Sequence, residues 1–153
     1  MSGCDAPRKA DLLARSDDTD EWLEALPRCG WWLHFAPDRS NPLYIGAVFR
    51  WPALYCTADV VIIMGMEVAW YYRVILDRPD ADPFDPHTLV YSSGYEPPTA
   101  IIREALSVPS PDALDAPMKA GPATEDEQVI AARLRRKPVV VVPPQRRQFG
   151  TGL

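Results

Sequence analysis

Residues 60–76 constrain the fold of this chain more than any other stretch. Ten of these seventeen residues are β-branched or aromatic: Val60, Val61, Ile62, Ile63, Val68, Trp70, Tyr71, Tyr72, Val74 and Ile75. Such side chains pack well on a pleated surface. A helical 3–4 spacing of apolar residues also runs through 58–77, but Gly65 weakens a helix by about 1 kcal/mol relative to alanine. We therefore predict two buried strands, at about 59–64 and 68–76, that turn near Gly65.

A β-hairpin is predicted just before these strands. Side chains alternate between two faces with a period of two in residues 31–36 and again in 43–51. The segment between them, PDRSNP, is rich in residues that bend a chain. A further short strand is predicted at 88–91, after a loop at 77–87 in which three prolines exclude a regular element.

Three helices complete the prediction. The first covers residues 10–26 and is expected to end at Pro27, and the second lies near 98–107, before Pro109. The third begins after a capping box formed by Thr124 and Glu127, and a short valine strand follows at 139–142. The predicted fold class is α+β: a mostly antiparallel sheet of four to five strands, an N-terminal helix, the helix near 98–107, and a C-terminal helix plus short strand.

The length of 153 residues fits a single domain core. The chain has 17 prolines, and the proline-rich stretches show where it divides into parts. We expect an α+β core domain at 1–107 and a proline-rich linker or arm at 108–123. Residues 124–153 would carry the C-terminal helix, the short strand and a basic tail, packed on the core or on a partner.

Charge separates this tail from the rest of the chain. Residues 1–127 hold all 21 acidic and 10 of the 16 basic residues, whereas 128–153 hold six basic residues and no acidic one. Such a split predicts an electrostatic role for the tail, toward a partner or toward its own acidic domain. The candidate partner-binding residues are Arg133, Arg135, Arg136, Lys137, Val140, Val142, Arg146 and Arg147.

The cysteine count and the hydropathy pattern bear on location. The three cysteines are odd in number and scattered, which argues against a disulfide framework and favours the cytoplasm. Charged residues interrupt the most apolar stretch, so no membrane span is predicted, and residues 1–10 lack the apolar core of a secretory signal.

No catalytic, nucleotide-binding or metal-binding signature is present, and neither a cofactor nor a metal is predicted. The acidic loop at 77–87 lacks the glycine and ligand spacing of a calcium loop, and the cysteines and histidines lack the paired spacing of a zinc site. An enzyme or ligand-binding domain would instead need a pocket that gathers scattered ionisable residues. The candidates for that pocket are His34, Asp59, Glu67, Arg73 and His87.

The leading functional prediction is a non-enzymatic protein–protein interaction or assembly subunit of a larger complex, such as a virion or a mobile-element assembly. It depends on aromatic residues that are too many to fit in a core on one face of the sheet. It also depends on an extended C-terminal part whose basic tail is opposite in charge to the body. The partner would be another protein or a second copy of the chain. One alternative is a nucleic-acid-associated accessory or regulatory protein that uses the basic tail. The other is a small enzyme or ligand-binding domain without a known motif.

Overall fold

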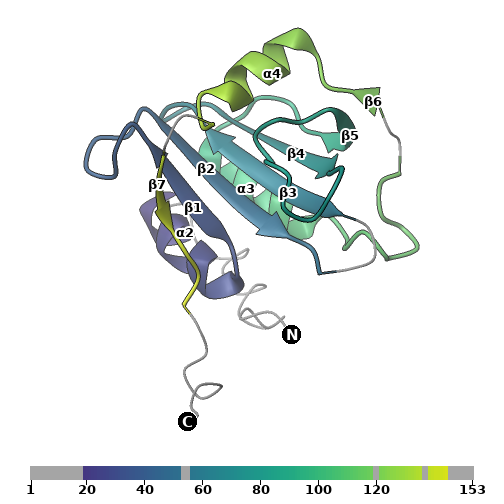
Figure 1. The fold of residues 1–153 in the computed structure, drawn as a ribbon. Coiled ribbons are helices and arrows are strands. Elements are labelled where there is room, and N and C mark those ends of the chain that lie inside the picture. Colours follow the sequence, from purple (N-terminus) through teal and green to yellow (C-terminus); the bar gives the residue numbers. More distant parts are fainter. Residues whose placement is uncertain (1–18, 53–55, 119–120, 136–137, 145–153) are drawn as a thin grey trace.

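The structure is a computed structural model that describes residues 19–52, 56–118, 121–135 and 138–144. Its centre is one antiparallel sheet with the strand order β6-β5-β4-β3-β2-β1-β7 (Figure 1). The strands are β1 Trp32–Ala36, β2 Tyr44–Arg50, β3 Thr57–Ile63, β4 Ala69–Ile75, β5 Thr88–Ser92, β6 Gly121–Pro122 and β7 Val139–Val141.

The predicted α+β class and antiparallel sheet are confirmed, and residues 58–77 form the two strands β3 and β4 rather than a helix. The sheet has seven strands instead of four to five, because the separately predicted valine strand, β7, and the unpredicted β6 both join it. The strand that sequence reasoning missed is β6, a glycine–proline pair inside the predicted linker that pairs with β5. Two residues are too few to show a period, so only the tertiary structure reveals this strand.

The helices are α2 Thr19–Ala25, the 3₁₀ helix η1 Leu26–Cys29, α3 Pro98–Ser107 and α4 Glu125–Ala132. The first helix was predicted to end at Pro27, but Pro27 lies in the first turn of η1, where its missing N–H costs nothing. Gly30, at φ 94°, ends η1 in the left-handed region. Residues 10–18 of that prediction lie outside the described residues. The Thr124–Glu127 capping box forms as predicted at the start of α4.

Helices α2 and α3 cover one face of the sheet, which we call the helical face (Figure 1). Alternation along the strands selects its residues, since every second side chain points the same way. The core of this face combines side chains from both helices with the odd-numbered residues of β1 to β4. Its largest fully buried members are Trp22, Leu26, Tyr71, Ile101 and Ile102.

The opposite face, which we call the loop face, is covered by α4 and by the loop at 77–87. Trp70 and Tyr72 are fully buried there, and the Tyr72 hydroxyl donates to the Pro83 carbonyl at 2.6 Å. Ala131 and Leu134 bring α4 and the turn after it into the same core. The sheet is therefore buried on both sides, which explains why β3 and β4 show no apolar–polar alternation.

The cysteines correct one expectation. Cys29 is disulfide-bonded, whereas Cys56 is a free thiol. The odd number and scattered positions of the cysteines argue against a framework of several disulfides, but they are compatible with one disulfide. As for membranes, none of the helices in the described part of the chain is both long and apolar enough to span a bilayer.

Candidate functional site

The five ionisable residues proposed for an enzyme pocket do not come together. Asp59 and Arg73 meet on the helical face, paired across β3 and β4. His34 points to the loop face, because it follows Leu33, whose side chain belongs to the helical core. Glu67 is exposed in the turn between β3 and β4, and His87 is exposed beside Asp85, at 3.5 Å.

Asp59 and Arg73 form a buried ion pair whose side chains are each 1% exposed. The Arg73 Nε donates to Asp59 Oδ1 at 2.6 Å and Nη2 donates to Oδ2 at 3.0 Å. The Tyr71 hydroxyl and the Trp51 Nε1 also donate to the carboxylate, at 3.1 and 3.0 Å. Arg73 Nη1 donates to the Pro109 carbonyl at 2.7 Å, which ties the segment after α3 to the sheet.

The protonation of this cluster suits a structural role. Burial raises the pKa of Tyr71 well above its ordinary value, and the neighbouring Asp59 adds to that effect. Burial alone would lower the pKa of Arg73, but its hydrogen bonds to Asp59 outweigh burial and raise it. Tyr71 is therefore held neutral and Arg73 charged, the two forms in which they hydrogen-bond to Asp59.

A cleft of about 470 Å³ lies on the loop face, between β1, β2 and the loop at 77–87. Trp32, His34, Arg50 and Asp82 supply its polar and aromatic lining. The Arg50 guanidinium donates to the carbonyls of Pro79 and Ala81 at 2.8 and 3.0 Å, so it holds the loop in place.

His34 is neutral in this cleft. Burial lowers its pKa to about 4, Asp82 opposes the shift, and Arg50 adds to it. Its ring packs edge-on against Phe84, at 4.9 Å between centroids, and no described residue hydrogen-bonds to its buried Nδ1. His34 therefore acts as a packed histidine, and the described residues offer it no nucleophile to activate.

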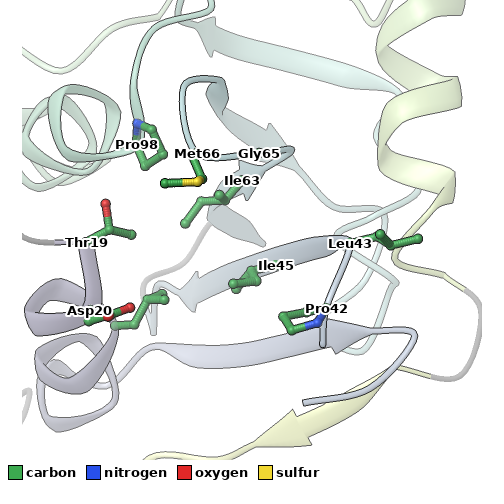
Figure 2. Close-up of a pocket in the computed structure, with 10 residues that line it drawn as sticks. Thr19, Asp20, Pro42, Leu43, Ile45, Ile63, Gly65, Met66 and Pro98 are labelled. Atoms are coloured by element: carbon green, nitrogen blue, oxygen red, sulfur yellow. The ribbon is translucent and has the colours of Figure 1, made fainter. Parts of the chain in front are cut away.

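A larger groove of about 730 Å³ opens on the helical face, at the end of the sheet where the β1–β2 connection lies. Figure 2 shows its lining residues, which come from the starts of α2 and α3, from β2, and from the end of β3 and the turn after it. Leu43 and Met66 stand at its rim, 66% and 89% exposed. Among the described residues that line the groove, Asp20 is the ionisable one.

Of the predicted basic partner-binding residues, the structure describes Arg133 and Arg135, and both contact their own domain. Arg133 lies over the Tyr44 ring at 5.4 Å, and Arg135 Nη1 donates to Phe84 O at 2.9 Å and to Asp85 Oδ1 at 3.0 Å. This part of the tail lies on the acidic body. The other four, Arg136, Lys137, Arg146 and Arg147, lie outside the described residues.

The predicted valine residues lie at one edge of the sheet that the described residues form. β7 pairs with β1 on one side and ends the strand order on the other. Val140 is opposite His34, so Val140, Val142 and Trp32 share the loop face. Trp32 and Val142 are 45% and 49% exposed, and Val140 is 41% exposed. We call Val139, Val140 and Val142 together with Trp32 the valine edge.

Neither the possible metal ligands nor the comparisons with known proteins indicate a function. Among the described residues no group of histidine, cysteine, aspartate or glutamate side chains could hold a metal ion. No protein-family model, curated protein or solved structure matches this chain.

Proposed function

We propose that this chain is a non-enzymatic assembly subunit that pairs with a second copy of itself through the valine edge. The observation that carries the proposal is an edge strand made of valines that has no partner strand on its outer side among the described residues, beside a half-exposed tryptophan. Edge strands in soluble proteins are protected from pairing by charges, bulges, prolines or short length. β7 has no charge within it, and its protection is limited to its length of three residues and to the flanking Pro138 and Pro143. Such an edge is a template for strand addition.

The geometry of the edge suits a twofold pair. Val140 is the middle residue of β7, so two copies can pair antiparallel with Val140 opposite its counterpart. Directly opposite side chains lie on the same face of a sheet. The exposed Trp32, Val140 and Val142 of both copies would then form one continuous apolar strip on the loop face.

Two alternatives receive less support. A small enzyme needs converging ionisable groups, whereas the Asp59–Arg73 pair and His34 lie on opposite faces of the sheet. A nucleic-acid-binding tail needs free cations, whereas Arg133 and Arg135 contact the domain itself. The cytoplasmic location predicted from the cysteines is not part of the proposal, because disulfides such as that of Cys29 persist mainly in oxidising compartments.

Light scattering behind size-exclusion chromatography tests the proposal, at low and high salt and over a range of protein concentrations. We expect a dimer that persists at high salt, because apolar and backbone contacts are little screened. Val140→Lys should weaken the dimer, since a lysine on an edge strand opposes pairing. The matched control is Val129→Lys, at a valine that is 52% exposed on helix α4 and not on a strand.

A chain that stays monomeric under all these conditions would refute the self-association. A dimer that responds equally to both lysine substitutions would place the interface elsewhere. Circular dichroism of each variant confirms that the sheet is retained.

A further inference from the structure

The cleft of about 470 Å³ on the loop face is as large as the sites that bind small molecules. The loop that forms one of its walls is held in place by side chains of the sheet. Arg50 donates to the carbonyls of Pro79 and Ala81, and the Tyr72 hydroxyl donates to that of Pro83. A cleft whose walls are fixed in this way loses little conformational entropy when a ligand enters.

The polar groups of this cleft differ in how far the domain itself satisfies them. Asp80 forms an ion pair with Arg78 at 2.8 Å. Asp82 Oδ1 accepts from the Phe84 N–H at 2.9 Å, and no described residue donates to its Oδ2. The guanidinium of Arg50 carries more N–H donors than its two carbonyl partners use. A ligand therefore meets a cationic donor and an anionic acceptor, which together favour a neutral molecule with both acceptors and donors.

Flat rings supply the apolar part of the lining. The indole of Trp32 is 45% exposed and lies opposite Val48 across β1 and β2, on the floor of the cleft. The rings of Pro79 and Pro83 stand in the facing wall, and the neutral imidazole of His34 adds a further planar surface. An exposed indole in such surroundings offers a stacking surface to a planar heterocycle.

We propose that this cleft binds a guanine base, with Trp32 stacked on the ring. Arg50 donates to O6 and N7, the pairing that a guanidinium makes with guanine, and Asp82 accepts from N1–H and the 2-amino group. A cationic ligand would be repelled by Arg50 and an anionic one by Asp82. An apolar ligand would bury both groups without partners. The site goes beyond the pairing of the valine edges and does not depend on it.

Equilibrium dialysis of the full-length chain with guanosine tests this assignment. We expect saturable binding, and we expect Trp32→Ala to raise the dissociation constant at least about fivefold, because it removes the stacking contact. Tyr95→Ala is the matched control, since Tyr95 is 54% exposed and does not line the cleft. It should leave the dissociation constant unchanged.

Asp82→Asn tests whether the carboxylate recognises the base. The amide still has an oxygen that accepts from the Phe84 N–H, but it presents an N–H donor where the carboxylate presented a second acceptor. Affinity for guanosine should fall, and affinity for xanthosine should rise, since xanthosine has a carbonyl in place of the 2-amino group. Loss of both ligands alike would contradict the contact. The control, Asp126→Asn at an exposed aspartate on α4, should change neither affinity.

Val140→Lys separates this inference from the proposed function, because Val140 does not line the cleft. Guanosine binding by this variant supports the cleft as a nucleobase site even if the valine edges do not pair. Absence of saturable guanosine binding by both the unchanged chain and Val140→Lys overturns the inference, and the dimer measurement still stands by itself. Tighter binding of adenosine than of guanosine overturns the assignment to guanine.

A single-stranded oligonucleotide with one guanine identifies the source of the base. Tighter binding of the oligonucleotide than of guanosine supports a base that belongs to a nucleic acid strand. Tighter binding of guanosine supports a free nucleoside, and failure of both ligands to bind overturns the inference.

Discussion

At the scale of single residues, Arg73 places a fully buried positive charge in the core. A buried guanidinium is tolerated only when its charge and its N–H groups are matched. Asp59 matches the charge, and the Pro109 carbonyl accepts a further N–H. Asp59 in turn accepts from Tyr71 and Trp51, so one carboxylate holds three parts of the chain together.

Removing one partner of this pair should be costly. Arg73→Met leaves the Asp59 carboxylate buried without its cation, and we expect a loss of about 3–5 kcal/mol in the free energy of unfolding. Urea denaturation measures the loss. The double variant Arg73→Met with Asp59→Leu should be clearly more stable than the sum of the two single changes implies, because no unpaired charge remains. Additive losses would show that the two residues do not depend on each other.

His34 predicts a specific pH dependence. Its pKa is lowered to about 4 by burial, against 6.5 for an unperturbed histidine. Between these values the unfolded chain binds a proton that the folded chain does not, so stability falls as pH decreases from 6.5 to 4. The contribution of one such proton is at most about 1.4 kcal/mol per pH unit. His34→Gln should remove this slope from urea denaturation midpoints.

The second histidine provides the control. His87→Gln makes the same chemical change at a histidine that is 65% exposed and lies outside the cleft of His34. Equal effects of both substitutions would assign the pH dependence to groups other than His34.

At the scale of elements, Gly46 in β2 sets how closely the loop face is covered. A Cβ at this position would lie 2.7 Å from the Phe84 ring and 2.8 Å from Leu134 Cδ1. The loop at 77–87 and the turn after α4 therefore pack on bare backbone. Both elements also contact each other, because Arg135 donates to Phe84 O and Gln128 donates to Pro86 O.

A methyl group at position 46 should push the loop at 77–87 and the turn after α4 away from β2. We expect Gly46→Ala to lower the free energy of unfolding by about 1–3 kcal/mol, as overpacking of a core does. Gly94→Ala is the matched control, since nothing lies within 4 Å of a Cβ there. Thermal unfolding followed by circular dichroism compares the two. A neutral Gly46→Ala would mean that α4 and the loop shift without loss.

At the scale of the whole molecule, the sheet is the feature that joins all parts. Helices α2 and α3 cover one face, and α4 returns the chain to the other, so β7 can close against β1 (Figure 1). Both long faces are thereby covered, and at the β7 edge exposed apolar side chains lie on a strand that has no outer partner in the described part of the chain. The light-scattering experiment above therefore addresses assembly at this edge.

The sequence by itself determined the local structure and the fold class. Period-two alternation, β-branched content and prolines located β1 to β5, α3 and β7, and the capping box located α4, because these signals act between near neighbours in the chain. It could not determine strand order, the pairing of β6, or which face each ionisable residue joins. His34 and Arg73 looked equivalent as candidates, and only the alternation of their strands placed them on opposite faces.

The two concave surfaces also depend on tertiary structure alone. Asp20, Ile45, Met66 and Pro98 line one groove although no spacing in the sequence relates them. From the sequence, Arg133 and Arg135 could face a partner or their own acidic domain, and the structure places them against Tyr44 and Asp85. The physical reason is that grooves and ion pairs form between segments far apart in the chain, and their positions follow from packing rather than from local propensity.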